Sequence, residues 1–309
     1  MKNVMKITDE FGLVNKITRG FKNYHNLVAG VGDDTAVIKN GNKYLLLTCD
    51  ALAEGDHFDC SWSTPEQIGN KAVEVNVSDV ASTGGRPTLM LISIAITKDT
   101  PEEWVVGVYR GIKQVCNKYK ITLAGGDTIN SGVRLISIAL LGESEKPILR
   151  SGARVGDLIG VTGVVGGAAA GLRLLKQGAK ISSLLKQKHL SPRARLDISD
   201  KIARYAHSMI DISDGVASEI KHICEESRKG AMVYAEQIPL CPGANLAEAL
   251  SGGEDYELLF TLAPGDTQKL KNSGVGFTII GEVTEKKNGI VLKKEGRNQT
   301  MPDGYNHFI

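Results

Sequence analysis

Apolar residues in the first half of the chain form short continuous runs that alternate with segments of helical spacing. A continuous apolar run bounded by turn residues is typical of a buried strand. Helical spacing predicts an amphipathic helix over residues 8–24 and two longer helices that begin near Thr64 and Thr100. The alternation indicates a mixed α/β fold. The expected strands lie at residues 36–38, 44–49, 88–97, 121–124 and 133–141.

Strong start signals mark the two longer helices. In the sequence Thr-Pro-Glu-Gln, Thr64 can cap the helix, Pro65 suits its first position and Gln67 completes a capping box. Residues 100–103 repeat the pattern. The helix from Thr64 carries an apolar stripe along one face, and Asp79 lies at the border of that stripe. Asp79 therefore either points into a cleft or is a partly solvated acid on its rim.

A linker at residues 150–153 precedes a second alternating pattern, so we expect one domain over residues 1–149 and another over 150–309. A strand at residues 158–162 leads into five residues rich in glycine and then a helix, a pattern that can hold an anion. Close packing of the helix on the strand explains these glycines equally well. Further elements are expected as strands near residues 209–212, 258–261, 277–280 and 289–292, and as a helix over about 191–205.

Composition narrows the class of protein. The 309 residues carry a formal net charge of +2 and include 5% aromatics, which argues against a nucleic-acid partner. The five cysteines are scattered and form no CxxC pair, so we expect a reducing, cytoplasmic location. The N-terminus lacks the apolar core of a signal peptide, and the apolar runs are too short to span a bilayer. We therefore expect no membrane partner.

Acidic residues recur at the edges of the predicted elements. The sequence Gly-Val-Gly-Asp-Asp at residues 30–34 places two carboxylates before a buried strand, where a cation would relieve their repulsion. Since neighbours on an extended chain point to opposite sides, one of the two is expected to face that cation. The acids at element edges are Asp34, Asp50, Asp79, Asp127, Asp211 and Asp214.

These acids suit a hard cation, Mg²⁺ in the first place. The six histidines are dispersed and show no ligand spacing, so the candidate ligands are all oxygen atoms. Mg²⁺ is usually bound by one or two carboxylates together with substrate phosphates. So many acids imply several ions and a polyphosphate such as ATP. The same acids would also suit a metal-dependent phosphohydrolase or a non-catalytic sensor of Mg-nucleotide.

Seven sequence blocks stand out in order along the chain: GVGDDTAV, TCDALAEGDHF, NVSDVASTGG, AGGDT, LRSGA, MIDISDG and SGGEDYELLF. In this order and spacing, from about residue 10 to the C-terminal GYNHF, they resemble the thiamine-monophosphate kinase family of the aminoimidazole-ribonucleotide-synthetase superfamily. Two related families, the selenophosphate synthetases and the hydrogenase-maturation proteins, use a cysteine near the N-terminus and the C-terminus respectively. Neither is present here, since the last cysteine is Cys241.

The resemblance implies an enzyme that transfers the γ-phosphoryl group of ATP directly to thiamine monophosphate, the last step of thiamine diphosphate biosynthesis. It implies a two-domain α/β subunit with the aminoimidazole-ribonucleotide-synthetase-like fold and a homodimer whose N-terminal strands form a shared barrel. It further implies several Mg²⁺ in the cleft between domains. No catalytic base is expected, because the acceptor phosphate oxygen is already anionic near neutral pH and the barrier is repulsion between anions.

The resemblance also implies roles for individual residues. The expected metal ligands are Asp34, Thr48, Cys49, Asp50, Asp79, Asp127, Asp211 and Asp214, with Thr48 and Cys49 acting through backbone or hydroxyl oxygens. The expected ATP contacts are Gly126, Asp127, Arg150 and Ser213. The expected thiamine-monophosphate contacts are His57, Glu254 and Tyr305. Tyr305 is included because residues 301–303 here lack the aromatic that the family places before its C-terminal motif. Without the resemblance, Arg150 is more often a surface charge and His57 a surface-loop histidine.

Overall fold

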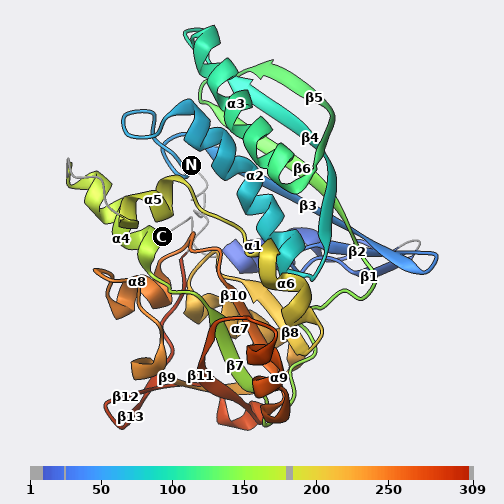
Figure 1. Ribbon diagram of the computed structural model, residues 1–309, viewed down its shortest axis with the longest axis vertical. Coiled ribbons are helices and arrows are strands. Elements are labelled where there is room, and N and C mark those ends of the chain that lie inside the picture. The colour runs from blue at the N-terminus through green and yellow to red at the C-terminus, as the bar shows by residue number, and fades with distance from the viewer. Residues whose placement is uncertain (1–9, 24–25, 179–183, 306–309) are drawn as a thin grey trace, which may run out of the picture.

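The computed structural model describes residues 10–23, 26–178 and 184–305, which form two β-sheets with helices packed against them (Figure 1). The first sheet has six strands in the order β1-β2-β3-β6-β4-β5. Its strands are antiparallel except for the parallel pair β4–β5. The strands are β1 (Leu27–Ala29), β2 (Ala36–Asn40), β3 (Lys43–Ala53), β4 (Arg86–Ile96), β5 (Thr122–Asn130) and β6 (Leu135–Ser144).

One face of this sheet is covered by helices and the other is open. Alternation along β3, β4 and β6 directs Leu46, Ile92 and Ile138 into the core on the covered face. Leu47 and Leu91, their neighbours in sequence, are exposed on the open face. The helices of this half are α1 (Glu10–Thr18), α2 (Pro65–Ser82) and α3 (Glu102–Tyr119). The helix predicted over residues 8–24 thus ends at Thr18, while residues 8, 9 and 24 lie outside the described ones.

Two strands continue past the points where the sequence indicated a turn. β3 runs beyond Asp50, and β5 runs through the Gly-Gly-Asp segment that contains Asp127. The prediction that these two acids lie at strand ends is therefore wrong. The physical reason is that neighbouring strands supply hydrogen-bonding partners along the whole length. β6 pairs with β3 as far as Ala53, and β4 pairs with β5 as far as Asn130.

Helix α2 carries Asp79 and lies between the two halves of the chain. Its predicted capping box is confirmed, because the backbone N–H groups of Gln67 and Thr64 each donate to the other residue's side chain. The predicted cap at Thr100 is wrong: Pro101 is the N-cap of α3, and Thr100 Oγ1 accepts from Arg134 Nε instead. α2 contacts the first sheet, α6 and β8, so it is buried on more sides than a single apolar stripe predicted.

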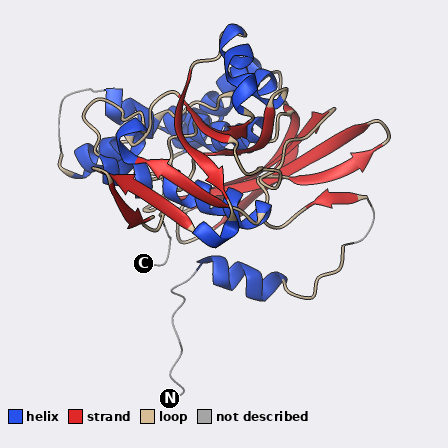
Figure 2. Cartoon of the chain, turned by 90° about the horizontal axis from the view of Figure 1, so that it is seen from below, coloured by secondary structure: helices blue, strands red, loops and turns tan. Residues whose placement is uncertain are grey.

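The second sheet has seven strands in the order β13-β12-β9-β11-β7-β10-β8, and Figure 2 distinguishes the strands of both sheets from their helices. The strands are β7 (Leu158–Thr162), β8 (Ala206–Asp211), β9 (Gly230–Tyr234), β10 (Leu258–Leu262), β11 (Phe277–Thr284), β12 (Ile290–Lys294) and β13 (Arg297–Thr300). The four strands predicted after β7 are confirmed as β8, β10, β11 and β12, whereas β9 and β13 were not predicted.

The helices of the second half are short. They are α4 (Gly167–Lys176), α5 (Leu184–Leu190), α6 (Leu196–Ala203), α7 (Val216–Ser227), α8 (Leu246–Ser251) and α9 (Thr267–Asn272), with 3₁₀ turns η1 (Ala235–Gln237), η2 (Pro264–Asp266) and η3 (Lys286–Asn288). The helix predicted from residue 191 begins only at Leu196. Among the residues described, no helix has the length and apolar character needed to cross a membrane.

Candidate active site

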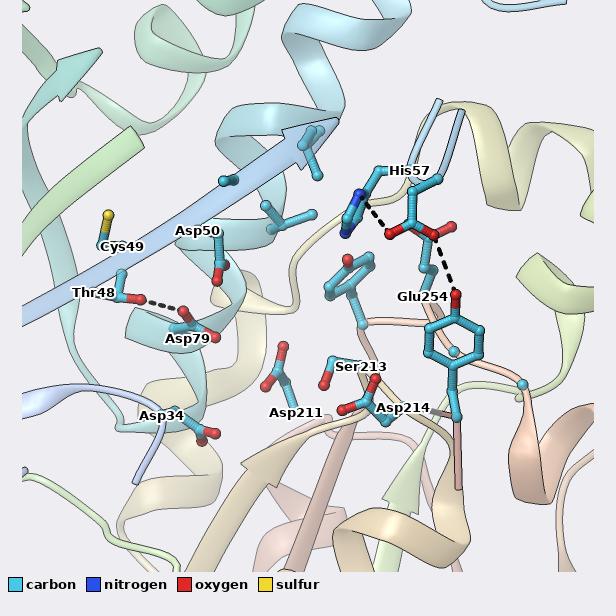
Figure 3. A pocket seen from close by; sticks show the side chains of 18 of the residues that line it. Asp34, Thr48, Cys49, Asp50, His57, Asp79, Asp211, Ser213, Asp214 and Glu254 are labelled. Carbon is cyan, nitrogen blue, oxygen red and sulfur yellow. Dashed lines mark hydrogen bonds and ion pairs between the residues drawn. The ribbon is translucent and has the colours of Figure 1, made fainter. Parts of the chain in front are cut away.

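A cavity of about 970 Å³ opens between the two halves of the chain, with α2 on one side and the end of β8 on another (Figure 3). Its volume lies in the range that accommodates small-molecule ligands. All but two of the residues predicted for the site line it. These are Asp34, Thr48, Cys49, Asp50, His57, Asp79, Arg150, Asp211, Ser213, Asp214, Glu254 and Tyr305.

Three carboxylates from distant parts of the chain meet in this cavity. Asp34 precedes β2, Asp79 lies near the end of α2 and Asp211 ends β8. One oxygen atom of each lies within 4.8 Å of one oxygen of the others. Asp50 joins them from β3, where alternation places its side chain on the same face as Thr48 and away from exposed Cys49 (Figure 3).

Hydroxyl groups orient each of the three carboxylates. Thr48 Oγ1 donates to Asp79 Oδ2. Ser78 Oγ donates to Asp211 Oδ2 at 2.5 Å, and Ser82 Oγ donates to Asp34 Oδ2 at 2.5 Å. Ser78 and Ser82 were not predicted as site residues. Their i, i+4 spacing on either side of Asp79 is the signal that would have placed them on one face of the helix.

Burial and mutual repulsion disfavour the ionised form of these acids. Burial raises the pKa of Asp79 well above its ordinary range, and the charges of Asp50 and Asp211 raise it further. Burial and the charge of Asp34 raise the pKa of Asp211 to about 8. Burial raises the pKa of Asp50 in the same way. A divalent cation would relieve both effects, and an all-oxygen donor set fits a hard cation such as Mg²⁺.

Arg150 and Asp33 complete this edge of the cavity. The Arg150 guanidinium forms an ion pair with Asp34, with Nε 3.0 Å from Asp34 Oδ1. Asp33 accepts the backbone N–H groups of Arg150 and Asp34, each at 3.1 Å. The two neighbouring aspartates therefore differ, since Asp34 faces the acid cluster and Asp33 accepts hydrogen bonds that join two loops.

His57, which Figure 3 shows, lies in another part of the cavity, with its Nδ1 3.6 Å from Asp56 Oδ2, and Asp56 in turn contacts Tyr305. The Ala53 N–H donates to His57 Nδ1 at 3.3 Å, so a neutral His57 ring carries its proton on Nε2. Tyr305 Oη donates to Asp56 Oδ1 at 3.2 Å. This contact joins the C-terminal segment to the loop that follows β3, across the opening between the two halves.

Ser213 and Asp214 form the loop between β8 and α7. The Asp214 N–H donates to Glu219 Oε1 at 2.9 Å, and the Tyr305 N–H donates to the Asp214 carbonyl at 2.9 Å. Glu219 is buried within α7, and burial together with the charge of Asp214 raises its pKa well above the ordinary range. Glu219 was not predicted as a site residue, because a glutamate in the first turn of a helix is commonplace.

Gly126 and Asp127 do not line the cavity. They lie on β5, at the edge of the sheet, and Asp127 pairs in register with Ser93 of β4. Ser93 pairs with Ser137 and Ser137 with Ala51, so Asp127 shares the open face with Ala51 and not the covered face with Asp50. At Gly126 a Cβ would lie 1.8 Å from the Ile92 carbonyl oxygen, which explains this glycine by close strand packing.

The glycine-rich turn before α4 already holds an anion from the chain itself. The Asp255 carboxylate accepts the Gly166 N–H at 2.5 Å and the Ala168 N–H at 3.1 Å. This carboxylate satisfies N–H groups at the start of the helix, which has no side-chain cap of its own. The N–H groups of this turn thus bind a carboxylate of the chain itself, which occupies the place where an external anion was predicted.

The chain matches the family model "AIR synthase related protein, N-terminal domain" over residues 32–144 and the corresponding C-terminal domain over residues 154–294. Together with two sheets that enclose an acid-lined cavity, these matches define a two-domain protein related to AIR synthase. Hydrogenase maturation protein HypE shares this fold, with a TM-score of 0.73 at 18% identity over 93% of this chain and 96% of that one.

Much closer similarity exists to one branch of this class. The chain is 37% identical to thiamine-monophosphate kinase from Aquifex aeolicus (strain VF5), over 98% of this chain and 99% of the relative. It is 32% identical to that of Bacillus subtilis (strain 168), over 97% and 99%. A solved structure described as AaThiL complexed with AMPPCP and TMP superposes with a TM-score of 0.89 at 36% identity, covering 99% of this chain and 100% of that one. The chain belongs to the thiamine-monophosphate kinase family.

Proposed function

We propose that this chain transfers the γ-phosphoryl group of ATP to the phosphate of thiamine monophosphate, giving thiamine diphosphate and ADP. The observation that carries the proposal is the meeting of Asp34, Asp79 and Asp211 in one cavity, with an oxygen of each within 4.8 Å. A solved structure that covers 99% of this chain is described as a complex with AMPPCP and TMP. Kinase chemistry needs substrates that are positioned and charges that are neutralised, which is what such a cavity can supply.

Several Mg²⁺ ions are part of the proposal. Asp34, Asp50, Asp79 and Asp211 would hold them, with Asp214 and the oxygens of Thr48 and Cys49 as further donors. Bound there, the ions supply Lewis-acid stabilisation of the phosphate charges. The donors of Thr48, Ser78 and Ser82 fix the carboxylate orientations before substrate arrives. No residue is assigned as a general base, because the attacking phosphate oxygen is already anionic near neutral pH.

The remaining cavity residues divide between the two substrates. Arg150 lies beside Asp34, and its planar guanidinium suits a nucleotide phosphate. Ser213 lines the same cavity and is assigned to ATP as well. His57 carries its Nε2 proton as a donor for the acceptor phosphate. Tyr305 and the loop of Glu254 line the same part of the cavity as His57. We call this part, where thiamine monophosphate is proposed to bind, the acceptor end.

We further propose a cytoplasmic homodimer of two-domain subunits, divided near residue 150, with a barrel formed by the open faces of the two first sheets. Large apolar side chains are exposed on this face or along its β5 edge, namely Leu47, Leu89, Leu91, Leu123 and Ile129. Exposed apolar patches of this kind mark interaction sites. Asp127 lies on the same face, so a second copy of the chain is the means by which Asp127 and Gly126 would reach a cavity.

The proposal is tested by incubating the protein with ATP, Mg²⁺ and thiamine monophosphate and quantifying every product. Thiamine diphosphate and ADP in equal amounts are expected. Free phosphate without thiamine diphosphate would show a phosphohydrolase instead. Tight nucleotide binding without turnover would show a sensor.

A further inference from the structure

A buried lysine joins the two loops that form the acceptor end of the cavity. The Lys71 side chain projects from α2 and is only 3% exposed. Its Nζ donates to the His57 carbonyl at 2.8 Å and lies 2.5 Å from Glu254 Oε1. An ammonium removed from water needs such partners, because an unpaired buried charge is strongly unfavourable. The Lys71 ammonium therefore contacts both the loop after β3 and the loop before β10.

The Glu254 carboxylate is held from its other side as well. His189, buried on α5, places Nδ1 2.9 Å from Glu254 Oε2. Burial alone would raise the pKa of Glu254, but the Lys71 charge and the His189 contact lower it to about 2. The carboxylate is thus ionised, and each of its two oxygens faces a donor from within the chain. Such a group is an anchor more than a free ligand.

The backbone at Glu254 also depends on this anchoring. Its φ angle is +70°, in the left-handed region that residues other than glycine rarely adopt. The Glu254 N–H donates to the Ser213 carbonyl at 2.7 Å, which links this turn to the loop of Ser213 and Asp214. A conformation of this kind persists only where the surroundings hold it. Releasing the carboxylate would therefore allow the whole turn to relax.

We propose that Lys71 and His189 are positioning residues that clamp Glu254 and thereby hold the acceptor end of the cavity in its binding geometry. This inference rests on the proposed kinase function. Lys71 acts through the His57 backbone and the Glu254 carboxylate, and His189 acts through Glu254 alone. Their loss should therefore weaken binding at the acceptor end. Asp34 and Arg150, beside which the nucleotide phosphates are proposed to bind, form a separate ion pair.

The test is steady-state kinetics of Lys71→Met, which keeps an apolar stem and removes the ammonium. The KM for thiamine monophosphate is expected to rise at least about tenfold, while the KM for ATP stays within about twofold. The matched control is Lys118→Met. It removes an ammonium of α3 that lies 2.8 Å from Glu74 Oε1 of α2, outside the cavity, and should shift neither KM.

An unchanged KM for thiamine monophosphate in Lys71→Met, or an equal rise in both KM values, would overturn the inference. If Lys71→Met does not fold, His189→Leu decides instead, because it leaves the lysine in place, fills the space of the ring and removes the donor to one Glu254 oxygen. In that variant the KM for thiamine monophosphate must rise while the KM for ATP stays unchanged. If both KM values stay at the wild-type level, the proposed clamp is wrong. A wild-type protein that forms no thiamine diphosphate would reject the kinase function itself, a result separate from either variant.

Discussion

Asp79 has the most demanding environment among the acids of the cavity. It is packed against Asp50 and close to Asp211 and Asp34, and burial raises its pKa well above the ordinary range. Thr48 supplies it with one hydroxyl hydrogen bond. Four carboxylates in one partly dry site weaken the folded protein unless a cation offsets them. The negative charge of Asp79 is therefore needed to bind the metal ions, but it lowers the stability of the metal-free protein.

Asp79→Asn separates those two demands. Asn keeps the size of the side chain and an acceptor for Thr48 but removes one negative charge from the metal cluster. Turnover is expected to fall by about 100-fold or more, while the metal-free protein melts at the same temperature as wild type or higher. Kinase assays and thermal melts with EDTA measure the two effects. Near-normal turnover would remove Asp79 from the metal site.

The raised pKa values also set a pH dependence. Asp211, with its pKa raised to about 8, binds more protons in the folded than in the unfolded protein between about pH 4 and pH 8. The metal-free protein should therefore lose stability as pH rises through that window. Mg²⁺ should raise the melting temperature more at about pH 8.5 than at about pH 6, because it favours the ionised carboxylates. A melting-temperature increase from Mg²⁺ that does not grow with pH would contradict this.

Helix α2 packs closely against α3 because both helices have glycines at their contact. A Cβ at Gly111 of α3 would lie 2.0 Å from the Glu66 carbonyl oxygen, and one at Gly69 of α2 would lie 2.0 Å from the Val108 carbonyl oxygen. The backbones of the two helices therefore approach more closely than any side chain allows. This contact fixes the position of α2, and with it the position of Asp79, against the first sheet.

Gly111→Ala tests that contact. Alanine favours a helix over glycine by about 1 kcal/mol, but here the helices would have to separate, and overpacking costs about 1–3 kcal/mol or more. We expect a net loss of about 2 kcal/mol in the free energy of unfolding, measured by urea denaturation. The control is Gly132→Ala, where a Cβ meets nothing within 4 Å. Equal stability of Gly111→Ala and wild type would show that the helices can move apart freely.

Local signals predicted some elements well and failed where tertiary partners decide. The capping box at Thr64 needs only residues close in sequence, so its prediction is confirmed. The extension of β5 through Gly125 and Gly126 depends on the neighbouring strand β4, which no local pattern reveals. Thr100 looks like a cap from its sequence, yet its hydroxyl oxygen accepts from the Thr97 N–H and from Arg134 Nε, 34 residues away.

The site depends on contacts between the two halves of the chain. The sequence supplied the acids and, through the resemblance, a list of residues, most of which line one cavity. It did not reveal that Ser78 supports Asp211 or that Lys71 reaches Glu254, because these pairs lie 133 and 183 positions apart. Lys71 in particular looks like any helix lysine until the second half is packed against α2.

Two copies of the chain are proposed to pair through the open face of the first sheet. Leu91 is 48% exposed on the open face of the first sheet, and Val155, in the second half, is 47% exposed and serves as the control. A charge at Leu91 would be buried in the proposed interface. Light scattering should therefore give the mass of a monomer for Leu91→Glu and the mass of a dimer for wild type and Val155→Glu. The monomer should also lose most kinase activity, because Asp127 faces away from its own chain's cavity. A wild-type monomer, or a fully active Leu91→Glu monomer, would show that Asp127 takes no part in the reaction.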